Sequence, residues 1–101
     1  MHEFRTVAKV EELRPGRGLR VEVEGRVLAL FKVGDEVRAL DNLCAHRGGS
    51  LADGEVEEGV VTCPLHAWAY DTATGTCVTN PGAAVRSYPV RVEDGKVQVA
   101  V

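Results

Sequence analysis

The chain has 101 residues and a formal charge of -3, and 45% of its residues are hydrophobic and 27% charged. These values are typical of one soluble globular domain, and the weak acidic charge without a Lys/Arg-rich run argues against a nucleic-acid-binding protein. The sequence has neither a signal-like N-terminus nor an apolar run of eighteen residues, so we expect a cytoplasmic protein without a membrane segment.

Apolar residues recur along the chain with a period near two, which predicts an all-β structure. One helical turn is expected near residues 10–13, closed by a Pro-Gly pair. Residues 19–24 alternate between apolar and charged side chains, and Gly25 then predicts a turn. The following segment, 26–33, is apolar on both faces and is predicted to be a central strand.

Two short turn sequences predict β-hairpins near the middle and at the C-terminus. Gly34-Asp35 is expected to join strands at 27–33 and 37–40, and Asp94-Gly95 to join strands at 90–92 and 97–101. Pro89 has no amide to donate and is expected at a strand start or edge.

The stretch from about Asp41 to Gly82 is different, because it is rich in glycine and only residues 59–63 look like a strand. We interpret it as a small metal-holding subdomain inserted into a β scaffold. Two short motifs inside it carry the candidate ligands, Cys44-Ala45-His46 and Cys63-Pro64-Leu65-His66.

Each motif therefore offers one thiolate and one imidazole. Sulfur ligands suit iron-sulfur, copper(I) or zinc sites, while imidazole suits iron, copper and zinc. A structural zinc site of two Cys and two His usually pairs like with like, whereas a 2Fe-2S cluster with two thiolates on one iron and two imidazoles on the other can be held by two mixed loops. The spacing favours the cluster, and a structural zinc module that mediates protein contacts is the alternative.

The strings C-A-H-R-G-G-S-L and C-P-L-H-A-W-A-Y-D resemble the two cluster-binding loops of the Rieske 2Fe-2S family. The resemblance implies one Rieske domain over 1–101, with an antiparallel β-sandwich base at about 1–41 and 83–101 and a cluster-binding subdomain at about 42–82. It also implies one 2Fe-2S cluster. Its ligands would be Cys44 and Cys63 on the inner iron and His46 and His66 on the solvent-facing iron. Asn80-Pro81-Gly82 matches a third loop of the family, which packs over the cluster.

Three positions separate this chain from the quinol-oxidising branch of the family. That branch has an additional cysteine in each loop and a serine that donates to a bridging sulfide, and the corresponding residues here are Gly49, Leu65 and Trp68. Tyr70 matches a family tyrosine whose hydroxyl reaches a ligating sulfur, and the alternative is a core aromatic with a solvated hydroxyl. We expect a reduction potential in the lower half of the Rieske range, raised by Tyr70.

The resemblance implies a soluble Rieske-type ferredoxin. Such a protein carries one electron from a reductase, expected to be flavin-dependent, to a terminal oxygenase or other terminal oxidoreductase component. The small subunit of an NAD(P)H nitrite reductase is the alternative within the family. The ring-hydroxylating oxygenases share the loop motifs, but their catalytic iron needs two further histidines and a carboxylate. The chain has three histidines, and two are assigned to the cluster, so we expect no catalysis by the chain alone.

Several other residues allow both a functional and a purely structural interpretation. Cys77 could be a ligand or a redox thiol, but the favoured interpretation is a small side chain packed in the core. Gly48 and Gly49 could let the backbone approach sulfur, or form an ordinary turn. Four acidic side chains between the two ligand motifs could steer a basic partner, or they could simply form an exposed turn; they are Asp53, Glu55, Glu57 and Glu58.

Overall fold

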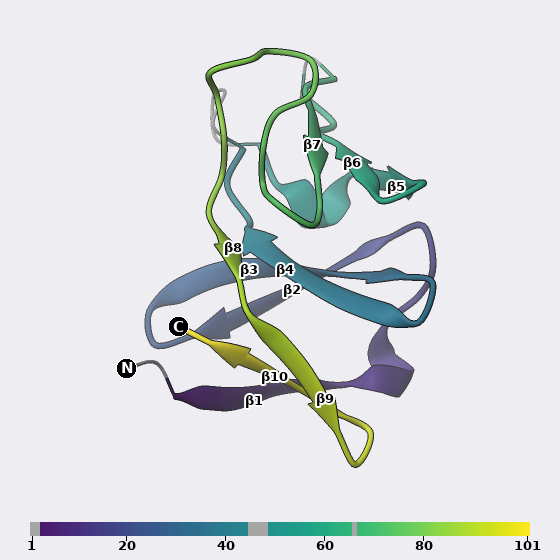
Figure 1. Ribbon diagram of the computed structural model, residues 1–101, viewed down its shortest axis with the longest axis vertical. Coiled ribbons are helices and arrows are strands. Elements are labelled where there is room, and N and C mark those ends of the chain that lie inside the picture. Colours follow the sequence, from purple (N-terminus) through teal and green to yellow (C-terminus); the bar gives the residue numbers. More distant parts are fainter. Residues whose placement is uncertain (1–2, 45–48, 66) are drawn as a thin grey trace.

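The computed structural model describes residues 3–44, 49–65 and 67–101, and its strands form three antiparallel sheets (Figure 1). The first has the order β1-β10-β9, with strands Phe4–Lys9, Lys96–Ala100 and Val90–Glu93. The second has the order β2-β3-β4-β8, with strands Gly18–Val23, Arg26–Val33, Glu36–Asp41 and Ser87–Tyr88. The third has the order β5-β6-β7, with strands Glu55–Glu57, Val60–Thr62 and Ala69–Asp71. The all-β prediction is confirmed.

Both predicted hairpins are present, and each has a two-residue loop. The β3–β4 pair closes at Val33 and Glu36 around Gly34-Asp35, and the β9–β10 pair closes at Glu93 and Lys96 around Asp94-Gly95. Asp94 and Gly95 have φ angles of 53° and 74°. Positive φ at both central residues gives the turn a twist that matches the flanking strands.

Helical structure in the described ranges consists of two single 3-10 turns, η1 (Val10–Glu12) and η2 (Leu51–Asp53). The first is the turn predicted at 10–13, and the Glu12 side chain accepts a hydrogen bond from the Lys9 amide at 2.8 Å. None of the helices found there has the length and apolar character needed to cross a membrane.

The prediction was incomplete for the shortest strands and for β1. Within 42–82 only the region of β6 was predicted, whereas β5 and β7 pair on either side of it. These strands have three residues each, too few to establish a period of two.

Strand β3 is buried on both faces, as expected for a central strand. Leu28 and Leu30 belong to a core between the first two sheets, and Ala29 and Phe31 belong to a second core beneath the third sheet. Pairing with β2 and β4 on its two edges leaves β3 enclosed by the rest of the molecule. The two cores therefore share one strand.

The third sheet occupies one end of a molecule that measures 37 × 28 × 17 Å (Figure 1). On one side it is held by backbone contacts to the segment before β2. The amide of Val56 donates to the carbonyl of Gly16 at 3.0 Å, and Arg17 forms a β-bridge with Glu55. On the other side β4 leads directly into the first candidate ligand loop.

Two glycines provide a test of how the turns are built. Gly25 and Gly75 have nearly equal φ angles of 78° and 83°, but a Cβ at Gly25 would have open space, whereas one at Gly75 would overlap the carbonyl oxygen of Val85. We expect Gly25→Ala to lower the free energy of unfolding by about 1–2 kcal/mol through backbone strain alone. Gly75→Ala should cost about 1–3 kcal/mol more because of the overlap. Equal losses in urea denaturation would contradict this account.

Candidate metal centre

The first candidate ligand loop is closed at its base by backbone hydrogen bonds. The amide of Cys44 donates to the carbonyl of Gly49 at 2.7 Å, and Leu43 forms a β-bridge with Ser50. Cys44 thus stands at one end of a short loop whose two sides are held together. His46 lies outside the described residues, as does Gly48.

Asn42 anchors this loop, a role that was not predicted from the sequence. Its side chain is buried, donates to Ser50 Oγ at 3.0 Å, and accepts from the amide of Ala52 at 2.9 Å. Its carbonyl also accepts from the amide of Leu51 at 2.8 Å. The sequence feature that could have predicted this role is an asparagine directly after a predicted strand, because asparagine side chains often form hydrogen bonds with the nearby backbone.

The second loop is closed in the same way. The amide of Cys63 donates to the carbonyl of Trp68 at 2.7 Å, and the amide of Ala69 donates to Thr79 Oγ1 at 3.1 Å. Ala67 has φ of 57°, a left-handed conformation that is uncommon for alanine. The loop thus reverses sharply just after His66, which lies outside the described residues.

The fold brings the two cysteines together in the second core. Cys44 and Cys63 are 4% and 1% exposed, and both belong to the same buried cluster. Gly49 makes the approach possible, because a Cβ there would lie 2.6 Å from Cys63 Sγ. This contact supports the interpretation that Gly49 lets the backbone approach sulfur.

Burial is the main reason why the pKa of the Cys63 thiol is raised above its ordinary value. The backbone hydrogen bond of Leu65 lowers this pKa, while the neighbouring Cys44 raises it through a hydrogen bond and through charge. A thiol of this kind holds its proton until a cation replaces it. The pair is therefore suited to a soft metal that compensates the charge of two buried thiolates.

Tyr70 is completely buried, and its hydroxyl lies 3.0 Å from Cys44 Sγ. The structure thus shows the predicted contact with the sulfur of a candidate ligand, and it excludes a solvated hydroxyl. Cys77 is also buried in the second core, and its Sγ lies 3.4 Å from Thr79 Oγ1. Its surroundings agree with the reading of a packed side chain.

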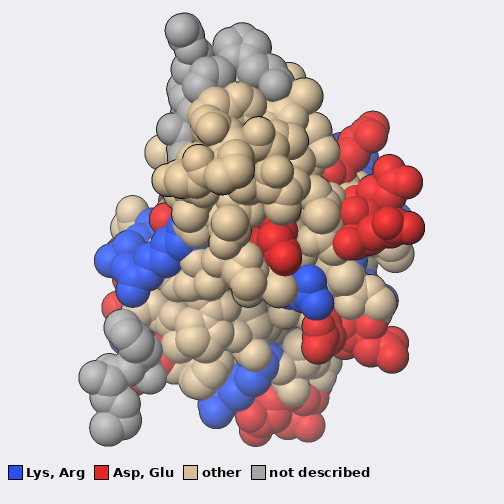
Figure 2. All heavy atoms as spheres, turned by 45° about the horizontal axis from the view of Figure 1, so that its top comes forward, with Lys and Arg blue, Asp and Glu red and all other residues tan. Residues whose placement is uncertain are grey.

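The described part of the surface around this centre is apolar. Among the large hydrophobic side chains of the described residues, Leu43, Leu65 and Val78 are 63%, 46% and 52% exposed. They belong to the segments that contain Cys44, Cys63 and Cys77, and we call them the apolar tip. Figure 2 shows that the described part of this end of the molecule carries few charged side chains on the face in view.

The described residues contain no group of three or more His, Cys, Asp or Glu side chains able to hold a metal ion. Two buried neighbouring thiols and the glycine contact beside them nevertheless fit half of a mixed sulfur and imidazole ligand set. The donors of the other half, His46 and His66, come from the motifs.

The family model of the Rieske [2Fe-2S] domain matches residues 3–89. The ferredoxin component of a naphthalene 1,2-dioxygenase system from Pseudomonas aeruginosa is 38% identical over 89 residues, which are 87% of this chain and 86% of that protein. The family match covers both candidate ligand motifs and all strands from β1 to β8, and it decides against a structural zinc module.

Two solved structures have the same fold. A protein assigned as an NADH-dependent nitrite reductase small subunit, from Mycobacterium tuberculosis, has a TM-score of 0.92 and 30% identity, over 100% of this chain and 96% of that one. A complex of reduced oxygenase and oxidized ferredoxin in carbazole 1,9a-dioxygenase contains a chain with a TM-score of 0.87 and 30% identity, over 96% and 92%. The protein is therefore an electron carrier that belongs to the Rieske [2Fe-2S] domain family, and its cofactor is one 2Fe-2S cluster.

Proposed function

We propose that this protein is the soluble, cytoplasmic ferredoxin of a multicomponent oxygenase system. It takes an electron from a flavin-dependent reductase and delivers it to a terminal oxygenase. The observation that carries this proposal is the buried pair of Cys44 and Cys63 next to an exposed apolar tip, in a chain similar to dioxygenase ferredoxins. The solved complex of an oxygenase with its ferredoxin supports the choice of partner.

We infer that Cys44 and Cys63 bind the inner iron and that His46 and His66 bind the outer iron. The burial and proximity of the two thiols support the first half of this assignment. The spacing of the motifs supports the second half. The cluster supplies a site that takes up and releases one electron. The division into a base, about 1–41 and 83–101, and a cluster-binding subdomain, about 42–82, is part of the proposal, and it agrees with the range of the third sheet.

The role of the protein residues is to bury sulfur and to present a small contact surface. Tyr70 donates a hydrogen bond to Cys44 when that sulfur is a thiolate, which stabilises negative charge on it. The apolar tip would lose water on contact with a partner, and its small area suits a transient encounter. The nearby acidic side chains of Asp53, Glu55, Glu57 and Glu58 are exposed, so they are available to steer a basic partner.

A nitrite reductase small subunit is the second candidate, because one of the similar structures carries that assignment. In that role the same site would serve inside a stable complex. The two candidates differ in association: a carrier purifies alone, whereas a subunit co-purifies in fixed stoichiometry with a larger reductase chain.

The ligand assignment predicts how the midpoint potential depends on pH. Reduction makes the imidazole ligands more basic, so the potential should be constant below the pKa of the oxidised form and should fall above it. The limiting slope for one proton per electron is about 59 mV per pH unit. Redox titrations followed by visible spectra measure it. A colourless protein that contains zinc but no acid-labile sulfide would contradict the assignment, as would a potential that is independent of pH.

Tyr70→Phe removes the hydrogen bond to Cys44 while keeping the ring in the core. We expect the midpoint potential to fall by about 40 mV, on the estimate that the bond is about 1 kcal/mol stronger in the reduced state. The matched control is Tyr88→Phe, since Tyr88 is also buried but its hydroxyl donates to Asp41 at 2.5 Å. An unchanged potential in Tyr70→Phe would show that the hydroxyl does not tune the centre.

The apolar tip should determine affinity for the oxygenase. Leu65→Gln is expected to raise the Kd of the complex about tenfold, because burying a leucine contributes roughly 1.5–3 kcal/mol. Val92→Gln is the control, since Val92 is 48% exposed but lies on β9, in the first sheet. Calorimetric titration with the oxygenase measures both variants. Equal losses of affinity would argue against docking through the tip.

A further inference from the structure

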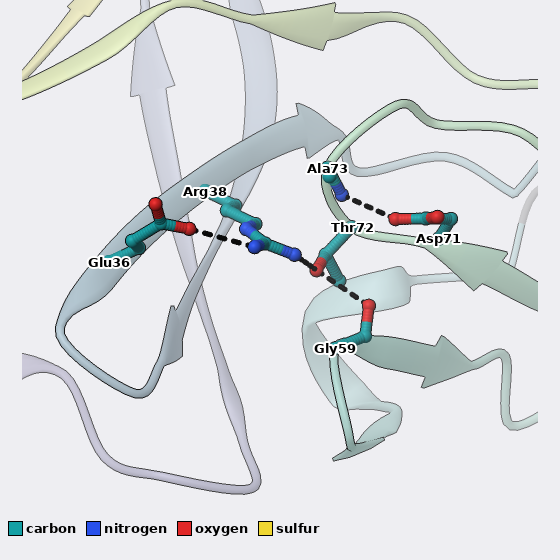
Figure 3. Close-up of polar contacts among 6 residues, drawn as sticks. All are labelled: Glu36, Arg38, Gly59, Asp71, Thr72 and Ala73. Atoms are coloured by element: carbon teal, nitrogen blue, oxygen red, sulfur yellow. Dashed lines mark hydrogen bonds and ion pairs between the residues drawn. The ribbon is translucent and has the colours of Figure 1, made fainter.

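Arg38 on β4 connects the second sheet to the third (Figure 3). Its Nη1 donates to Thr72 Oγ1 at 3.2 Å, and its Nη2 donates to Glu36 Oε2 at 2.8 Å. Glu36 and Arg38 are two residues apart on one strand, so their side chains lie on the same face. With both nitrogens engaged, the Arg38 side chain is only 25% exposed.

Thr72 extends this connection into the third sheet. It is 1% exposed, and both its hydroxyl and its amide donate to the carbonyl of Gly59, at 2.7 and 2.9 Å. The Thr72 hydroxyl donates its single proton to the carbonyl of Gly59, so its oxygen accepts the hydrogen bond from Arg38 through a lone pair. The turn at Gly59 lies close by, because a Cβ there would be 3.4 Å from Arg38 Nη1.

Two hydrogen-bonded contacts and two stretches of main chain together form a closed path that includes Cys44. Along the main chain, Arg38 leads through the end of β4 to Cys44, whose sulfur lies 3.0 Å from the hydroxyl of Tyr70. Tyr70 is followed on β7 by Asp71 and then by Thr72, which returns to Arg38. Cys44 is carried by the second sheet and Tyr70 by the third, so the distance between them depends on how the two sheets are placed. The Arg38 contact joins the two sheets two residues from Tyr70, at a point remote in sequence from the contacts of Gly16 and Arg17.

We propose that Arg38 is a positioning residue for the redox centre. It holds the end of β7 so that the Tyr70 hydroxyl stays within hydrogen-bond distance of Cys44, and it thereby raises the reduction potential. The inference rests on the proposed function, because it takes Cys44 as a ligand of the cluster. Hydrogen bonds to ligating sulfur tune the potential of iron-sulfur centres, and such bonds weaken steeply with poor geometry.

The test compares midpoint potentials of the cluster-loaded protein in variants at three positions. Thr72→Val removes the hydroxyl without changing any charge, and Arg38→Met removes the donors. Each should lower the potential by at least half of the shift produced by Tyr70→Phe. Neither substitution should lower the potential further when it is combined with Tyr70→Phe, because the hydrogen bond to Cys44 is then already absent. Thr72→Ser retains the hydroxyl and should retain the wild-type potential.

Arg20→Met is the matched control for lost charge. Arg20 lies on β2 and pairs with Glu22, also two residues away, at 3.3 Å. This variant should have the wild-type potential. A wild-type potential in Thr72→Val would overturn the inference, as would an unchanged potential in Tyr70→Phe or shifts in Arg38→Met and Tyr70→Phe that simply add. Those outcomes leave the proposed function intact, whereas a wild-type protein that binds no cluster would contradict both.

Discussion

The burial of β3 on both faces is the constraint on which the rest of the structure depends. Leu28 and Leu30 fill the base core, while Ala29 and Phe31 fill the core under the metal centre. A slip of one residue in its pairing would exchange the two sets of side chains. The register with β4 pairs Leu28 with Asp41, and the first ligand loop begins directly after that pair. The packing of β3 therefore determines where Cys44 is placed.

The centre separates two physical requirements of an electron carrier. The sulfur atoms of Cys44 and Cys63 are enclosed by the second core, where low polarity strengthens the contact between Cys44 and the Tyr70 hydroxyl. The proposed contact surface lies outside, in the exposed side chains of the apolar tip. Three short segments provide both features, so the segments that bury sulfur also carry exposed leucine and valine side chains.

Buried polar side chains connect the base of the molecule to the segments around the metal centre. Asn42 and Thr72 are the buried polar residues among the described positions, and both have hydrogen-bond partners. Burying such groups is costly unless they are hydrogen-bonded. Asn42 joins the end of β4 to the first ligand loop, and Thr72 joins β7 to the turn at Gly59 and to Arg38. Each polar contact thus orients one side of the metal centre relative to the base.

The sequence by itself determined the fold class, the hairpins, the family motifs and the contact of Tyr70 with the sulfur of a candidate ligand. Alternation and turn residues act within a few positions, and the Cys-X-His and Cys-X-X-His spacings are equally local. It did not reveal β1, the short strands β5 and β7, the anchoring role of Asn42, or the contact of Arg38 with Thr72. A strand of three residues has no readable period, and a hydrogen bond between residues 34 positions apart depends on how two sheets pack. Only the tertiary structure decided that Arg38 and Tyr70 both help to position the surroundings of Cys44, because no local rule relates side chains on different sheets.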